Sequence, residues 1–372
     1  MWLKSIEIKN FRNYRDACVQ LTDGLNVLEG RNGSGKTNFL EAVGLLSHGK
    51  SIRIRNLEDL IKDGESQAIL RGIFENEYGS PLSVNCVLDR NQGKRFRVNG
   101  KAAVRISDIF RLVPTVQCFE QDTFLLQGAP AVRRTFIDCL CAQLFPDYLK
   151  THRDFRDALK QRNAALRRGT LKGSLKKATD TVFAQKAAPI NILRRVALNK
   201  FSTVLEERRQ DFKEDVELTI SQKDLAGDES LGNEVEALLQ RLEKASAEEA
   251  KYNRTSVGPH RDSFNFKISG GKIRWRSSRG QIKNMVLRIK MAEYHLLRQD
   301  LGRIPIVILD DVFAEMDEVR RGNLENLLAL GAQVFWASTG LSQLKISEGR
   351  KFLRLEIDDG VVSNRKEILA AA

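Results

Sequence analysis

The sequence predicts an α/β protein whose head is formed by both ends of the chain, with an α-helical arm inserted between them. A glycine-rich loop at 30–37 lies between an apolar run and an amphipathic stretch, and a second apolar run at 306–309 ends in two aspartates. From about 133 to 250, apolar residues recur at helical spacing and glycines are few. We therefore place the head at 1–130 and 255–372 and the arm at 131–254.

The first hundred residues predict strands around a single helix. Residues 1–30 contain extended, alternating runs, the last of which leads into the glycine loop. Apolar side chains then recur every three or four residues up to Gly49, which predicts a helix. Residues 68–98 alternate between apolar and polar, and Asn99-Gly100 is a strong tight-turn sequence. This region is therefore expected to be an antiparallel meander.

The second half of the chain predicts a return from helices to strands. Strand alternation returns at 263–268, and a helix with one apolar face is expected from Gln281 to Arg298. The apolar run at 306–309 is typical of a central parallel strand, because such strands are buried on both faces.

Composition narrows the function classes. The chain of 372 residues is 42% hydrophobic, and its net charge of +13 favours a polyanionic partner. Ten Lys and Arg residues stand against two acids at 148–177. The five cysteines lack zinc-ligand spacing, so reduced and mostly buried thiols are expected. With neither a signal peptide nor an apolar membrane span in the sequence, we expect a cytoplasmic protein.

The loop at 30–37 is a complete phosphate-binding sequence. Its glycines let backbone amides surround phosphates, Lys36 can reach the β and γ oxygens of ATP, and the Thr37 hydroxyl can ligate Mg²⁺. The helix that follows adds its positive end to this anion site. The residues expected to bind nucleotide are Gly30, Arg31, Asn32, Gly33, Ser34, Gly35, Lys36 and Thr37.

The run at 306–311 is the natural second half of such a site, because ligands of open α/β sheets bind at the carboxyl ends of strands. Asp310 is expected to hold the metal with Thr37, and Asp311 to orient and polarise the attacking water. Lys36, Asp310 and Asp311 are therefore the candidate catalytic residues.

A third motif lies about thirty residues before these aspartates. The sequence Ser278-Arg279-Gly280-Gln281 at the start of a helix resembles the signature of ATP-binding-cassette (ABC) ATPases, and the stretch ending in Asp317 resembles their D-loop. This resemblance implies an ABC-type P-loop ATPase head of mixed sheets and helices. It also implies that Ser278, Gly280, Gln281 and Asp317 contact ATP held by a second copy of the chain, in an ATP-dependent dimer.

Several further stretches are similar to the RecF family. They include Asn10-Phe11-Arg12-Asn13-Tyr14 near the start, the arm stretch at 160–166, and Gly258-Pro259-His260-Arg261-Asp262. The resemblance implies an ATP- and Mg²⁺-dependent DNA clamp that binds duplex beside single-stranded gaps and works with RecR and RecO in loading RecA. Its DNA contacts are expected at Arg153, Arg156, Lys160, Arg162, Arg167 and Arg168.

The chain departs from the family pattern at its switch. Trp336-Ala337-Ser338-Thr339 contains no histidine, so we expect slow hydrolysis, and the family resemblance implies that DNA stimulates it. Gln117 and Gln121 are both candidates for a Mg²⁺-sensing glutamine. His260 and Arg261 fit either a turn or a catalytic role, and Arg12 fits either a nucleotide contact or a surface pair.

Three other functions fit less well. A nuclease fusion of the overcoming-lysogenisation-defect type needs a carboxylate-rich domain, but only about thirty residues follow Thr339. A transporter subunit would not explain the basic arm. An ATP-dependent scaffold without DNA contact has the same motifs, and a DNA-binding assay separates it from the leading hypothesis.

Overall fold

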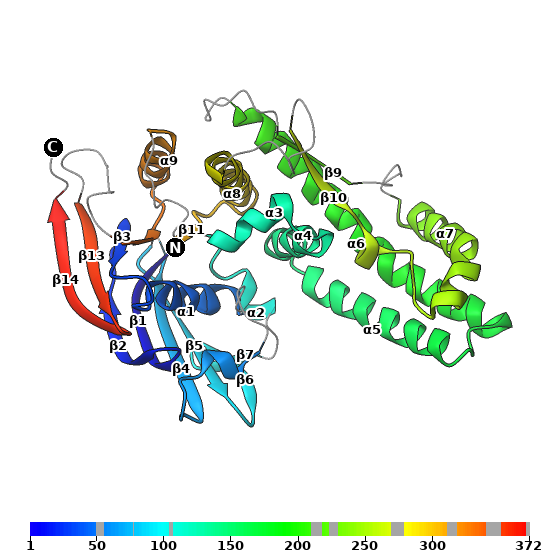
Figure 1. Ribbon diagram of the computed structural model, residues 1–372, viewed down its shortest axis with the longest axis horizontal. Helices are drawn as coiled ribbons and strands as arrows, with labels where there is room; N and C mark the ends of the chain where they lie inside the picture. Colours follow the sequence, from blue (N-terminus) through cyan, green and yellow to red (C-terminus); the bar gives the residue numbers. More distant parts are fainter. Residues whose placement is uncertain are drawn as a thin grey trace. The chain divides into compact units, whose positions relative to one another are not determined.

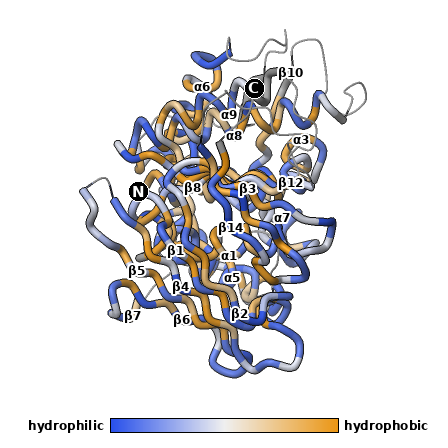
Figure 2. Tube along the Cα trace, turned by 90° about the vertical axis from the view of Figure 1, so that its left-hand side faces the viewer, coloured by the Kyte–Doolittle hydropathy of each residue, from blue (hydrophilic) through white to orange (hydrophobic). Residues whose placement is uncertain are grey.

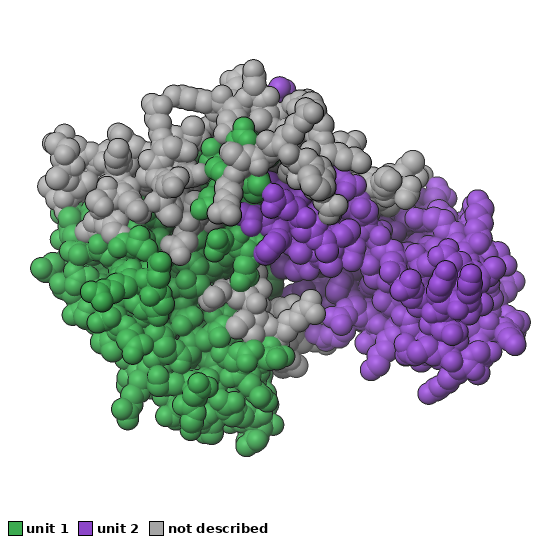
Figure 3. Space-filling model, viewed as in Figure 1, with its two compact units in different colours: residues 1–122, 210–214, 279–372 green, residues 123–209, 215–278 purple. Residues whose placement is uncertain are grey.

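The computed structural model describes residues 1–49, 56–76, 78–103, 107–209, 218–222, 230–268, 279–310, 318–339 and 351–369. Its elements are shown in Figure 1. The chain divides into two compact units, coloured in Figure 3. The head unit holds residues 1–122, 210–214 and 279–372, and the arm unit holds residues 123–209 and 215–278.

The first sheet of the head unit is antiparallel throughout. Its strand order is β2 (Tyr14–Gln20), β1 (Trp2–Phe11), β4 (Gln67–Glu75), β5 (Pro81–Asp89), β6 (Gly93–Val98) and β7 (Lys101–Ala103). Hydrophobic and hydrophilic residues alternate along β1 and β4, as Figure 2 shows, so one face packs on the core. The predicted turn is confirmed, because Asn99 and Gly100 both adopt the positive φ that it requires.

The second sheet carries the predicted parallel strands. Its order is β14 (Val361–Leu369), β13 (Lys351–Asp358), β3 (Leu25–Glu29), β12 (Val334–Ser338), β11 (Ile306–Asp310) and β8 (Thr115–Cys118). All neighbours are parallel except the edge strand β14. Every residue of β11 is buried, including Asp310, which the strand carries at its carboxyl end.

Helix α1 (Lys36–His48) lies between the two sheets. It contacts β1 and β4 of the first sheet and β8, β11 and β12 of the second. The sequence predicted one apolar side for this helix. Eleven of its thirteen residues are buried instead, because each of the two sheets covers one side of the helix. At its end Gly49 adopts a left-handed φ of 64° and caps the helix by bonding the Leu45 carbonyl.

The remaining head helices are α2 (Ser107–Phe110), α8 (Arg279–Leu301) and α9 (Glu318–Ala329), with a 3₁₀ turn η1 (Glu58–Leu60). Helix α8 packs on β8. It begins two residues before and ends three residues after the predicted helix from Gln281 to Arg298.

The arm unit is mainly helical. After the 3₁₀ turn η2 (Glu120–Thr123), its elements are α3 (Phe124–Gln127), α4 (Pro130–Leu144), α5 (Tyr148–Arg167), α6 (Gly173–Glu207), β9 (Leu218–Gln222), α7 (Leu231–Tyr252), η4 (Pro259–Arg261) and β10 (Phe264–Ile268). The long helix α6 packs against α4, α5 and α7. Strands β9 and β10 form a separate antiparallel pair.

The boundaries of the arm unit differ from the predicted arm at 131–254. The stretch after α7 was placed in the head, but it packs within the arm unit. The Arg194 guanidinium of α6 donates to the Pro259 carbonyl and to Asp262, both at 2.8 Å. Phe266 of β10 lies 6.5 Å from Phe136, ring centre to ring centre. These buried contacts fix η4 and β10 to the helices.

Two expectations from composition concern cysteines and membrane spans. All five cysteines are free, and Cys86, Cys118 and Cys141 are buried, which confirms mostly buried thiols. Among the described residues, none of the helices combines the length and apolar character needed to cross a membrane.

Candidate nucleotide-binding site and arm surface

The loop from Gly30 to Gly35 joins β3 to α1, as the motif requires. Gly33 and Gly35 have φ of 82° and 115°, in the left-handed region that favours glycine. A Cβ on Gly35 would come within 2.7 Å of the Asn13 side chain, so the close approach also needs glycine. The loop therefore turns directly into the amino-terminal end of α1, where backbone amides favour an anion.

Lys36, Thr37 and Asp310 meet at this loop. The Lys36 ammonium is almost fully buried and donates to the carbonyls of Gly30 at 2.7 Å and Arg31 at 2.9 Å. The Thr37 hydroxyl donates to Asp310 Oδ1 at 3.1 Å, although 273 residues separate the two. A hydroxyl and a carboxylate side by side are oxygen ligands of the kind Mg²⁺ prefers.

The residues present fit a Mg²⁺-nucleotide. Besides the amides of the loop, the buried Ser34 hydroxyl has no hydrogen-bond partner among the described residues and is free to donate to a phosphate oxygen. The structure thus brings Gly30, Arg31, Asn32, Gly33, Ser34, Gly35, Lys36 and Thr37 together with Asp310.

Of the other predicted nucleotide contacts, two are in helix α8 and the rest fall outside the described residues. Gly280 and Gln281 are exposed in the first turn of α8. Asp311, Ser278 and Asp317 fall outside the described residues, and so does the rest of the expected D-loop.

Asn13 and Gly360, to which the sequence assigned no role, both form hydrogen bonds to the loop. The Ser34 carbonyl accepts from Asn13 Nδ2 at 3.1 Å and from the Gly360 amide at 2.8 Å. Asn38 of α1 donates to Asn13 Oδ1 at 2.9 Å, which fixes the Asn13 amide. Gly360 has φ of 75°, and a Cβ there would lie 2.5 Å from the Asn13 carbonyl oxygen. Asp359 and Gly360 both adopt positive φ in a turn, but no local sequence pattern connects this turn with the loop.

The structure clarifies two residues that the sequence left open. Arg12 donates through Nε and Nη2 to Glu41 Oε2 at 3.0 and 2.9 Å, and Glu41 is buried, so Arg12 is a paired residue. His260 lies in η4, where its Nε2 is 3.0 Å from the Thr255 carbonyl. Burial lowers the pKa of His260 to about 4, which keeps it neutral and favours the structural role.

The two glutamine candidates differ in their surroundings. Gln117 is buried, and its Nε2 lies 2.8 Å from His48 Nδ1. Burial, with the charge of Lys290, lowers the pKa of His48 to about 3, so the imidazole stays neutral and accepts this bond. Gln121 is exposed in η2. The amide nitrogen of Gln117 therefore donates to His48.

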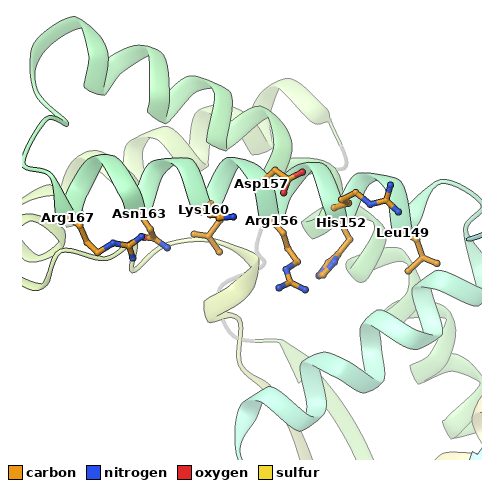
Figure 4. A pocket seen from close by; sticks show the side chains of 9 residues that line it. Leu149, His152, Arg156, Asp157, Lys160, Asn163 and Arg167 are labelled. Carbon is orange, nitrogen blue, oxygen red and sulfur yellow. The ribbon is translucent and has the colours of Figure 1, made fainter. Parts of the chain in front are cut away.

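A cationic groove runs along α5, with a volume of about 620 Å³ (Figure 4). Side chains three, four or seven positions apart share this side of the helix. Its charged and polar lining residues are His152, Arg153, Arg156, Asp157, Lys160, Asn163 and Arg167. The predicted phosphate contacts other than Arg162 are all exposed, and of these Arg168 alone is not part of the lining. Because Asp157 is the only acid in this lining, the groove suits a polyanion.

Arg162 is a correction to the predicted DNA contacts. Its side chain is 1% exposed and forms ion pairs with Asp180 at 2.9 Å and Glu249 at 2.7 Å. It also donates to the Thr255 hydroxyl at 2.8 Å. Arg162 lies on the side of α5 that packs against its neighbours, so it cannot reach a DNA backbone.

Known proteins resemble this chain over nearly its whole length. A family profile described as "RecF/RecN/SMC N terminal domain" matches residues 2–361. The "DNA replication and repair protein RecF" of Pediococcus pentosaceus is 31% identical, over 99% of this chain and 100% of that protein. The protein of the same name from Oenococcus oeni is 32% identical, over 93% and 95% of the two chains.

Solved structures show the same fold. A structure titled "recombination mediator protein RecF-ATP in RecFOR pathway" superposes with a TM-score of 0.88 at 27% identity, over 99% of this chain and 97% of that one. An Smc head domain from Pyrococcus furiosus gives a TM-score of 0.56 at 15% identity, over 99% and 96%. The head is thus an ABC-type ATPase head with an inserted helical arm, as the sequence predicted.

Proposed function

The chain belongs to the RecF branch of the RecF/RecN/SMC family, and we propose that it is an ATP-dependent DNA-binding protein of recombinational repair and replication restart. In this proposal an ATP-induced dimer binds DNA at the junction between a single-strand gap and duplex, and helps RecO and RecR load RecA. Slow hydrolysis then resets the clamp. The observation that carries the proposal is the meeting of Lys36, Thr37 and Asp310 at the glycine loop.

The loop residues have distinct roles in this proposal. ATP with Mg²⁺ supplies the phosphoanhydride bond that water can cleave. Lys36 and the amides of the loop balance the phosphate charge, and Thr37 and Asp310 offer oxygen ligands to the metal. Asp311 polarises the attacking water. Asn13 and Gly360 hold the Ser34 carbonyl, so the loop keeps its shape before it binds.

Dimer formation completes the site. Ser278, Gly280, Gln281 and Asp317 of one copy are proposed to contact the nucleotide held by the loop of the other. Neither copy alone then has a full set of contacts, so ATP binding couples to dimer formation. Hydrolysis removes the ATP that holds the two copies together, and its rate therefore sets how long the dimer stays on DNA.

The arm supplies the DNA contacts in this proposal. Four exposed cations line the groove on α5, namely Arg153, Arg156, Lys160 and Arg167, and the exposed Arg168 follows Arg167 in the chain. Contacts to phosphates do not distinguish one base from another, so binding should not depend on the DNA sequence. Because such contacts release counterions, binding should weaken steeply as the salt concentration rises. Each cation that contacts a phosphate should add about one to the slope of log affinity against log salt.

Fluorescence anisotropy with a labelled gapped duplex tests the proposal. Wild type should bind tightly only with ATP, Lys36→Ala should lose the ATP effect, and an Arg156→Gln/Lys160→Gln double variant should show a shallower salt slope. Lys244→Gln, which removes an exposed lysine of α7 outside the groove, is the matched control. ATP binding without any DNA binding would contradict the proposal and favour the scaffold alternative.

A further inference from the structure

A second, smaller pocket lies in the arm unit at the carboxyl end of α7. It has a volume of about 220 Å³ and is lined by Glu248, Tyr252, Arg254, Ser256 and Arg261. None of these residues lines the groove on α5. The Tyr252 side chain is 53% exposed, which is unusual for a large aromatic residue.

The chain around this pocket is held firmly in place. Asn253 ends α7 in the left-handed conformation, with φ of 51°. The Thr255 amide donates to Asn163 Oδ1 at 2.8 Å, and the Ser256 amide donates to Glu249 Oε1 at 2.6 Å. The buried Arg162 pairs with Glu249 and bonds Thr255. A pocket fixed in this way loses little conformational entropy when a ligand binds.

The lining combines an aromatic ring with unpaired cations. Arg254 Cζ lies 5.6 Å and Lys251 Nζ 5.5 Å from the centre of the Tyr252 ring. In the described part of the chain, neither Arg254 nor Arg261 forms an ion pair, and Glu248 is the one carboxylate in the lining. Guanidinium groups bind phosphate, and a tyrosine face stacks on a nucleobase.

From this combination we propose that the pocket binds a nucleotide of single-stranded DNA, with the base against Tyr252 and the phosphate against Arg254 and Arg261. This inference rests on the proposed DNA-binding function and adds a site for the unpaired strand. A duplex cannot use the site in this way, because its bases are stacked inside the helix. An acidic peptide would need the two arginines but not the ring.

The pocket and the groove on α5 meet at one residue. Asn163 lines the groove and also holds the Thr255 amide beside the pocket. Arg167 follows one turn later at the end of α5, Arg168 comes directly after the helix, and both are exposed. A duplex backbone in the groove and an unpaired strand in the pocket would therefore be neighbours, which gives the arm a physical basis for preferring a gap junction.

The test measures the affinity of the full chain, with ATP, for a labelled thymidine oligonucleotide and for a blunt duplex. Tyr252→Leu should weaken oligonucleotide binding by about fivefold or more, since losing one base-stacking contact has an effect of this order. Duplex binding should be unchanged. Tyr252→Phe keeps the ring and should bind as wild type does. When the complex is irradiated with ultraviolet light, an oligonucleotide that contains 5-iododeoxyuridine should crosslink to the peptide that carries Tyr252.

Three results would overturn the inference. The first is an equal oligonucleotide affinity for wild type and Tyr252→Leu, and the second is a crosslink found only in other peptides. The third is equal competition by poly-glutamate in both proteins, which would show that the site binds by charge alone. Failure of the DNA-binding function is distinguishable, because it removes duplex binding from wild type as well. Because Tyr252 is exposed, its variants should fold as wild type does, and far-ultraviolet circular dichroism checks this.

Discussion

Replacing Arg162 by alanine tests the structure of the arm most sharply. The guanidinium lies between two buried carboxylates, those of Asp180 and Glu249, at 2.9 and 2.7 Å. Asp180 keeps a second partner, because Lys176 Nζ lies 3.1 Å away. Among the residues that the structure describes, the Glu249 carboxylate keeps only its bonds to Ser256. Arg162→Ala therefore leaves a buried carboxylate without its counter-charge.

The expected cost follows from that geometry. Removing one partner of a buried ion pair destabilises a protein by about 3–5 kcal/mol. The variant also loses the bond to the Thr255 hydroxyl and the contact of the guanidinium with the Phe183 ring, 5.6 Å away. Within the described part of the chain, Glu249 has no second cation of the kind that Asp180 keeps in Lys176, so we place the estimate in the upper half of this range. Arg156→Ala, an exposed change on the same helix, should cost under about 0.5 kcal/mol.

Urea denaturation followed by circular dichroism at a helical wavelength measures both variants. Arg162→Ala should unfold at clearly lower urea than wild type, and Arg156→Ala at almost the same concentration. The opposite pattern would refute the assignment of Arg162 to the interior. So would an Arg162→Ala protein of normal stability whose duplex affinity falls as far as that of Arg156→Ala.

Three further variants test the site and the packing. Gly360→Ala should weaken ATP binding, because a Cβ at φ of 75° would lie 2.5 Å from the Asn13 carbonyl oxygen; equal affinity by calorimetry would show that this turn does not support the loop. Asp310→Asn should abolish Mg²⁺-dependent hydrolysis in a phosphate-release assay, and retained turnover would remove Asp310 from the metal site. His260 has a pKa lowered by burial from 6.5 to about 4, so its contribution to stability is present above pH 6.5 and is lost as pH falls toward 4. His260→Gln should flatten the fall of the urea midpoint in that window, and an unchanged slope would contradict the burial of this imidazole.

Local sequence patterns predicted the elements that depend on local chemistry. The glycine loop, the strand at 306–309 and the Asn99-Gly100 turn were identified because each needs particular residues at fixed spacing. The spacing of apolar residues along α5 also indicates that Arg162 is buried. Phe155, Ala158, Arg162 and Leu166 recur every three or four residues and are all buried. Arg162 was predicted to contact DNA because it lies in a cluster of basic residues. Its position on the helix places it on the buried face instead.

Long-range contacts could not be predicted in this way. The support of the Ser34 carbonyl by Asn13 and Gly360 joins both ends of the chain, and no local pattern records that meeting. The return of η4 and β10 to the arm unit has the same cause. It depends on Arg194 of α6 finding Asp262 and the Pro259 carbonyl, 65 or more residues later.

Mixing two inactive variants tests whether the ATPase site is shared between two copies of the chain. Lys36→Ala removes the loop lysine and Ser278→Arg blocks the signature, so each protein alone should neither hydrolyse ATP nor sediment as a dimer on gapped DNA. In a mixed dimer, one of the two shared sites has an intact loop from one copy and an intact signature from the other. Mixing should therefore restore part of the ATPase activity, whereas a mixture as inactive as its components would contradict a site shared between two copies.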